Sequence, residues 1–143
     1  MTAPLAPHQT SRAGALTGPL VLGGIGLTAA AVLHLRDPHA DGSYGFCPFL
    51  ALTGLPCPGC GGLRAVNDVT RGDLVAAISS NAMAVALVVA LTGLWAIWLS
   101  QRLRGRREAQ MLSVTTPTVV VVVAVIVVFG VLRITPWGAW LAP

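Results

Sequence analysis

The chain has 143 residues, of which 55% are hydrophobic and only 10% are charged, whereas a soluble domain usually carries about a quarter charged residues. A mean hydropathy of +0.76 agrees with this deficit of charge. Both values argue against a water-soluble domain. The nine basic residues are all arginines and form no long basic face that alternates with aromatic residues, so the net charge of +4 does not indicate nucleic-acid binding.

Residues 1–12 are rich in Pro, Thr, Ala and Ser and predict a disordered cytoplasmic tail. Residues 13–35 carry no formally charged side chain and exceed the roughly 20 residues that a helix needs to cross a bilayer. We expect Thr17 to cap this first transmembrane helix and Pro19 to lie in its first turn. A signal peptide cleaved near the alanines at 29–31 is the alternative, but the apolar stretch exceeds the usual length of about 7 to 15 residues, which favours retention.

The segment 36–73 predicts a loop of a different character, rich in Cys, Pro and Gly. All three cysteines of the chain lie in it, at Cys47, Cys57 and Cys60. This concentration, with prolines and glycines to fix the turns, indicates a covalent or coordinative role beyond packing. Toward its end we expect a short interfacial helix along the membrane surface, on which Arg64 and Asp68 are four residues apart and able to pair.

Residues 74–101 predict the second transmembrane helix, with Asp73 as its cap. Asn81, two turns into this span, is the only strongly polar side chain at that depth and should face protein. Small residues four apart predict close helix packing, either between the spans or against a partner, with chance spacing as the alternative. They are Gly26 and Ala30 on the first span and Ala82, Ala86 and Ala90 on the second.

Residues 102–110 form an arginine-rich loop that holds Arg102, Arg104, Arg106 and Arg107. The densest basic cluster is expected to stay in the cytoplasm. The N-terminus is then cytoplasmic as well, and the cysteine loop is extracytoplasmic. Five arginines lie inside and four outside in this arrangement, so the orientation depends on the density of the cluster.

Residues 111–134 predict the third span, where Thr116-Pro117 repeats the cap arrangement, so that the hydrophobic helix proper covers about 117–134. The tail 135–143 is expected outside. Tryptophans that close the second span or follow the third are predicted anchors at the membrane interface: Trp95, Trp98, Trp137 and Trp140. The sequence therefore predicts an all-α, multi-pass protein of an inner (plasma) membrane, with three transmembrane helices, a Cys/Pro/Gly-rich extracytoplasmic loop and a short interfacial helix.

From residue 46 to residue 83 the sequence resembles a bacterial family of small membrane proteins with a domain of unknown function. The family pattern is a Cys-Pro, Thr-Gly, Cys-Pro-Gly-Cys-Gly and Arg-Ala series followed by Gly-Asp and Asn-Pro. Leu63 stands where threonine is common, and Ala82 replaces the proline after Asn81, so a polar contact and a helix kink cannot be carried over. The matching residues are Cys47, Pro48, Thr53, Gly54, Cys57, Pro58, Gly59, Cys60, Gly61, Arg64, Ala65, Gly72, Asp73 and Asn81.

Within that family, the size and layout of the chain are similar to those of a factor that associates with the respiratory supercomplex of cytochrome bcc and cytochrome aa3 in high-GC Gram-positive bacteria. The family itself implies no activity. The similarity to the factor implies an accessory role.

Three chemistries remain open for the cysteines. A disulfide within the loop, Cys57 to Cys60 or Cys47 to one of them, suits an oxidising compartment. Zinc is the second, because Cys57 and Cys60 resemble a zinc knuckle that Cys47 with His34 or His39 would complete. The third is thiol-disulfide exchange, since a helix that begins near Cys60 would favour a thiolate.

The sequence contains no carboxylate pair, serine-histidine set or phosphate loop, and no ionisable group lies deep within a span, which argues against ion transport. Apart from zinc, no cofactor is expected. We expect a non-catalytic accessory subunit or scaffold that contacts the lipid bilayer and binds other integral membrane subunits. The alternative is an extracytoplasmic thiol-redox or metal-handling protein that uses the Cys57 and Cys60 pair.

Overall fold

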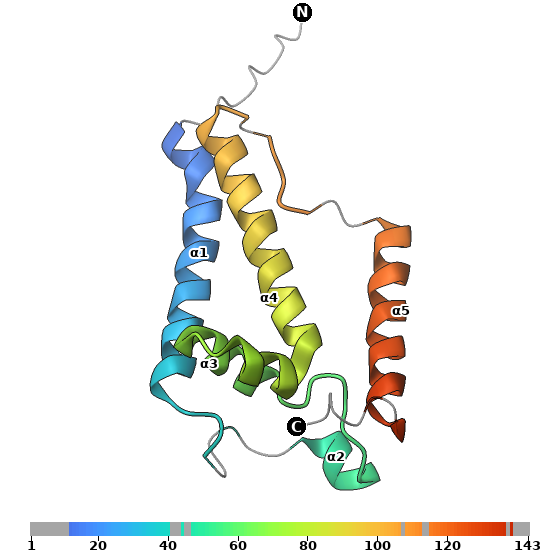
Figure 1. Ribbon diagram of the computed structural model, residues 1–143. Helices are drawn as coiled ribbons and strands as arrows, with labels where there is room; N and C mark the ends of the chain where they lie inside the picture. The colour runs from blue at the N-terminus through green and yellow to red at the C-terminus, as the bar shows by residue number, and fades with distance from the viewer. Residues whose placement is uncertain are drawn as a thin grey trace, which may run out of the picture.

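The computed structural model describes residues 12–40, 44, 47–106, 108–112, 115–136 and 138, which form five helices and, within these ranges, no strand. Three of the helices are long and apolar enough to cross a membrane. The all-α fold with three spans is thereby confirmed, and the chain is a multi-pass membrane protein (Figure 1). The helices are α1 (Arg12–Leu35), α2 (Pro48–Thr53), α3 (Gly62–Arg71), α4 (Leu74–Leu103) and α5 (Thr116–Arg133).

The helices α1, α3 and α4 pack on one another, and α3 lies across one end of the other two (Figure 1). In the described part of the chain α5 makes no extensive contact with another helix, and Figure 1 shows it standing apart from α4. Among the described residues, α5 contacts the cysteine loop at one end, and at the other end the chain 104–115 links it to α4.

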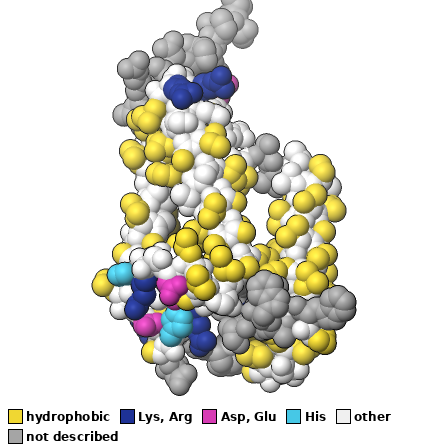
Figure 2. Space-filling model, viewed as in Figure 1, with side chains coloured by type: hydrophobic (Ala, Val, Ile, Leu, Met, Phe, Trp, Pro, Cys, Tyr) yellow, Lys and Arg dark blue, Asp and Glu magenta, His cyan; other side chains and the backbone are white. Residues whose placement is uncertain are grey.

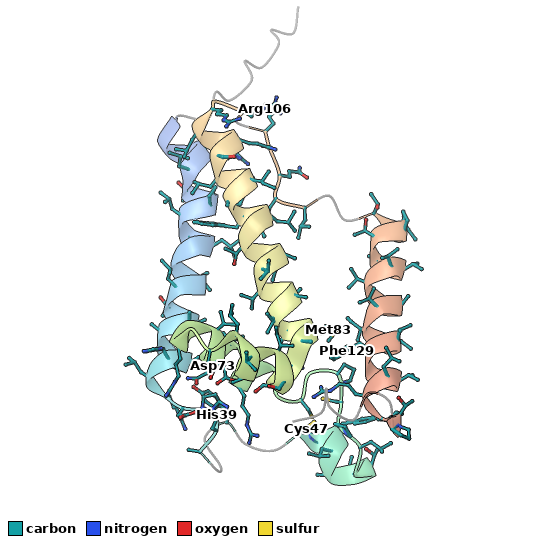
Figure 3. All side chains as sticks on the ribbon, in the orientation of Figure 1. His39, Cys47, Asp73, Met83, Arg106 and Phe129 are labelled. Atoms are coloured by element: carbon teal, nitrogen blue, oxygen red, sulfur yellow. The ribbon has the colours of Figure 1, made fainter. Side chains whose placement is uncertain are left out.

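The arginine-rich loop and the cysteine loop lie at opposite ends of the long helices, as the labels of Arg106 and Cys47 show in Figure 3. Figure 2 shows arginines at the end with the arginine-rich loop. At the end with the cysteine loop it shows a mixed group of His, acidic and arginine side chains, and hydrophobic side chains lie between the two ends. This separation is what the expected topology requires. Which end faces the cytoplasm stays a prediction.

Two tryptophans of α4 fill the contact with α1. A Cβ added at Gly23 would lie 2.7 Å from Trp95 Cζ2, and one at Gly18 would lie 3.1 Å from Trp98 Cη2. The glycines therefore make room for the indole rings. Trp95 Nε1 donates to the Pro19 carbonyl at 2.8 Å, so this indole bonds α1, although membrane anchoring would leave its N–H to water.

The close contacts between α1 and α4 include two glycines outside the set of small residues predicted to pack. Gly26 is exposed, with no heavy atom within 4 Å of an added Cβ, and Ala86 and Ala90 are exposed as well, whereas Ala30 and Ala82 are half-buried. The α1–α4 contact uses Gly18 and Gly23 because large rings lie opposite them. Packing of the predicted residues against a partner stays a prediction, and Trp137 and Trp140 lie outside the described residues.

The helix starts follow the predictions in part. Asp73 caps α4 by accepting from the Ala76 amide at 2.9 Å, as expected. However, α1 begins at Arg12 and contains Pro19, so Thr17 is not its cap; proline is tolerated inside membrane helices, where neighbouring groups satisfy the freed backbone. At α5 the cap position falls on Thr115, and the helix runs from Thr116 with proline in its first turn, later than the boundary expected at residue 111.

Candidate functional site

The three cysteines come together at one end of the molecule. Cys47 directly precedes α2, whereas Cys57 and Cys60 lie in the turn before α3. The Sγ atom of Cys57 is 3.5 Å from that of Cys47 and 3.4 Å from that of Cys60, and all three sulfurs lie within 4.8 Å of one another. All three are half-buried free thiols, so a disulfide among them stays a prediction.

The motif residues around the sulfurs shape two tight turns. Gly54 (φ 70°) ends α2 and Gly61 (φ 76°) precedes α3, and both adopt the left-handed conformation that glycine accommodates without steric cost. Thr53 Oγ1 donates to the Phe49 carbonyl at 2.6 Å and accepts from the Leu55 amide at 3.2 Å. The Cys60 amide bonds the Cys57 carbonyl at 3.1 Å. The turns bring the Cys47 sulfur, at the start of α2, next to the sulfurs of Cys57 and Cys60.

Asn81 joins this loop to α4. It is fully buried, and its Nδ2 donates to the carbonyls of Pro58 at 2.9 Å and Cys60 at 3.0 Å. Its Oδ1 accepts from the Ala84 amide at 2.9 Å, three residues on, which is the bond of an N-cap. The prediction that Asn81 faces protein is confirmed.

The same residue interrupts α4, because its backbone is non-helical (φ −167°, ψ 97°). The helix therefore has a kink at this position without the proline that the family pattern places next. The Asn81 side chain accepts from the Ala84 amide in place of the interrupted backbone bond, and its Nδ2 donates to the loop carbonyls.

Arg133, the last residue of α5, holds the loop from the other side. It is 2% exposed, and its Nη1 donates to the carbonyls of Cys57 at 3.1 Å, Pro58 at 3.3 Å and Cys60 at 2.9 Å. One turn earlier, an added Cβ at Gly130 would lie 2.9 Å from Pro58 Cγ. The absence of a side chain at Gly130 thus allows the backbone of α5 to approach the loop.

The guanidinium of Arg133 has unused donors. Its Nε and Nη2 are buried and have no hydrogen-bond partner, and no carboxylate pairs with it among the residues that the structure describes. A buried cation without a counter-charge is costly. From the sequence, Arg133 counted only as one of the four arginines outside, at the end of the third span, and no contact was predicted for it; the signal was a single arginine, three residues after a glycine, at the end of a long uncharged stretch.

The cysteines differ in their tendency to ionise. Burial, as the largest effect, raises the pKa of the Cys60 thiol to about 11, so this group is protonated at neutral pH unless a cation is bound. Backbone hydrogen bonding from Leu50 at the start of α2 lowers the pKa of Cys47. Cys47 therefore forms a thiolate at lower pH than Cys60.

A second polar cluster lies beside the first, between α1, α3 and α4. His39 contacts Asp37 at 2.8 Å and Asp68 at 3.4 Å, and Asp68 also accepts from Ser80 Oγ at 3.0 Å. Arg64 Nε donates to the Pro38 carbonyl at 3.3 Å. The expected Arg64–Asp68 pair is therefore replaced by contacts with other segments, because the end of α1 and the start of α4 offer closer partners.

The two histidines proposed as zinc ligands belong to this second region. His34 Nδ1 lies 3.0 Å from Thr70 Oγ1, and His39 is held between two carboxylates. Within the described residues, the only cluster of potential metal ligands is the three sulfurs. The structure thus brings Cys47, Cys57 and Cys60 together and leaves both histidines elsewhere.

The remaining motif residues have structural positions. Pro48 opens α2, Ala65 is fully buried in α3, and Gly72 (φ 81°) ends that helix before the Asp73 cap of α4. They fix how the loop enters and leaves the helices. The reactive groups of the site are the three sulfurs, and its buried hydrogen-bond donors are Asn81 and Arg133.

Residues 47–95 match the model of a family described as protein of unknown function (DUF2752). No curated protein and no solved structure matched the chain. The matched segment begins at the first cysteine and includes all three sulfurs and Asn81 but not Arg133. The resemblance seen in the sequence is confirmed for this segment, and the helix that carries Arg133 lies outside it.

Proposed function

We propose that this membrane protein, whose residues 47–95 match a family of unknown function (DUF2752), is a non-catalytic accessory subunit, or scaffold, that binds other integral membrane proteins. A respiratory complex of cytochrome bcc and cytochrome aa3 is the candidate partner that the size and layout of the chain favour. In this proposal the cysteine loop faces outward and the arginine-rich loop faces the cytoplasm.

The observation that carries the proposal is the isolation of α5. This helix is fastened at Arg133 and Gly130 to the cysteine loop and makes no extensive contact with another helix in the described part of the chain. Its valines from Val119 to Val123 are 47% to 61% exposed. In a membrane these surfaces meet either lipid or another protein, and helices in bilayers associate through packing of such faces.

The test is recovery of partners with the tagged full chain after gentle detergent extraction, followed by identification of the copurifying subunits. Arg133→Met, which unfastens α5, should reduce recovery several-fold, whereas Arg104→Met at the opposite end should not. A chain that purifies alone, or equal recovery with both variants at matched expression, contradicts the scaffold function. Reporter fusions at Gln110 and Ala40 test the orientation, and phosphatase activity at Gln110 with none at Ala40 contradicts it.

A second candidate function is thiol-disulfide exchange, and one observation favours it. Cys57 has two other thiols within 3.5 Å, so after its thiolate attacks a substrate disulfide, either neighbour is placed to attack the mixed disulfide and release the reduced substrate. Loss of a dithiol-oxidising or disulfide-reducing activity in Cys57→Ser, with unchanged partner recovery, would favour this function over the scaffold.

A further inference from the structure

The sulfur positions match one face of a tetrahedral metal site. With a zinc–sulfur distance of about 2.3 Å, two thiolates of a tetrahedral site are about 3.8 Å apart. The measured separations of 3.4 and 3.5 Å, with the third no greater than 4.8 Å, require shifts of a few tenths of an ångström on two edges and at most about 1 Å on the third. The ligands come from two segments that the loop turns hold in place.

A disulfide explains only part of this arrangement. It would join Cys57 to one neighbour and leave the other thiol beside it, although Cys57 is almost equally close to both. A pair alone would need neither the third sulfur in the cluster nor a second element to hold it there. A single ion uses all three sulfurs.

Charge supplies the second, independent observation. Arg133 is 2% exposed, has two nitrogens without partners and bonds the carbonyls of Cys57 and Cys60. Three thiolates and a divalent ion carry one net negative charge, and the adjacent guanidinium matches it. A monovalent ion on the same thiolates would leave a second negative charge unmatched. Protonated thiols would leave the buried arginine with the Phe129 ring, 5.5 Å from its Cζ, and with no counter-charge among the residues that the structure describes.

We infer that Cys47, Cys57 and Cys60 bind one Zn²⁺ ion as three thiolates, with Arg133 as the counter-charge and the fourth coordination position open to a ligand from outside the chain. Binding releases the protons of whichever thiols are protonated. Three protein ligands with an open position are typical of zinc sites that exchange a ligand, whereas closed structural sites have four. The inference is independent of the scaffold function, since it concerns what the loop holds.

The experiment measures zinc in the full chain purified in mild detergent. We expect one Zn²⁺ per chain by elemental analysis and a loss to near zero in each of Cys47→Ser, Cys57→Ser and Cys60→Ser. The matched controls are His34→Ala and His39→Ala, which should retain the ion. Cobalt substituted for zinc should show thiolate charge-transfer absorption in the wild type and in both controls.

Because a serine variant can fail to fold, the wild type provides a second measurement. Bound Zn²⁺ should protect all three thiols from alkylation, and a chelator should expose them. The inference is overturned if zinc stays bound in the cysteine variants, if alkylation is the same with and without Zn²⁺, if two of the sulfurs prove to be joined in the zinc-loaded protein, or if the protein retains Cu⁺ in place of zinc.

Discussion

Two neighbouring junctions hold segments of this molecule together by different contacts. One is the cysteine junction, where α4 and α5 contact the loop 57–60, and the other is the α1–α3 junction around His39. The first uses buried side chains, Asn81 and Arg133, that donate to backbone carbonyls. The second has one buried donor of the same kind, Asn67 Nδ2 to the Leu33 carbonyl at 2.6 Å, and adds ion pairs such as Asp37 with Arg71, whose side chains are 43% and 47% exposed. Removing a buried donor leaves acceptors without partners, whereas exposed pairs contribute little, so the buried donors should hold both junctions firmly and the exposed pairs of the second should add little stability.

The largest effect is expected at Arg133, and it tests the comparison most severely. Arg133→Met removes the donor shared by three carbonyls and should lower the free energy of unfolding by about 3 kcal/mol. Hydrogen exchange at residues 57–60 should increase together with a lower midpoint of thermal unfolding in detergent. Arg104→Met, at an exposed position of the opposite end, is the matched control, and an equal loss in both variants would contradict the bracing role.

Asn81 should follow, with a loss of about 2 kcal/mol in Asn81→Ala, because the Pro58 and Cys60 carbonyls keep Arg133 as a donor. Asn81→Asp separates the two roles of the side chain, since it preserves an acceptor for the Ala84 amide but donates nothing to the loop. We expect faster exchange of the loop amides in both variants and unchanged exchange at the Ala84 amide only in Asn81→Asp. Identical behaviour of the two variants at Ala84 would rule out the internal cap.

These two residues also mark the limit of what the sequence predicts. The three spans follow from uncharged length, and the Asp73 cap and the buried Asn81 follow from single polar side chains at defined positions. Arg133 was not predictable in the same way, because its partners lie 73 to 76 residues earlier in the chain. Likewise, the kink at Asn81 arises from contacts with the loop and not from a local proline, and the α1–α4 packing depends on which glycines face the indole rings.

A smaller effect is expected at Gly130, where the comparison is tested by shape alone. In Gly130→Ala the new methyl group meets the Pro58 ring, so the loop or α5 must shift, at a cost of about 1 to 2 kcal/mol. Gly93→Ala is the control on α4, since nothing lies within 4 Å of a Cβ there. Comparison of the two unfolding midpoints decides the matter, and a neutral Gly130→Ala would show that the close approach is not required.

The smallest effect on stability is expected at the exposed Asp37–His39 contact of the second junction. The His39 backbone amide and then its side chain lower the pKa of Asp37 below 3.8, so the contribution of this carboxylate to stability is present above pH 3.8 and is lost as the pH falls through the folded-state pKa. His39→Ala should raise that pKa only in part, because the amide remains. Titration of the Asp37 carboxyl by NMR in detergent measures it, and a midpoint at or above the ordinary value in the wild type would contradict the prediction.

The attachment of α5 at both of its ends has a kinetic consequence. Residues 104–115 link it to α4 and, even fully extended, reach about 40 Å, so release of Arg133 leaves the helix close to its binding site. Rebinding is then intramolecular, at an effective concentration in the range of millimolar for a short connection. A helix from another protein that binds the cysteine loop in place of α5 must therefore compete with a tethered helix. The rate of such a replacement would depend on how often the contact between Arg133 and the loop opens.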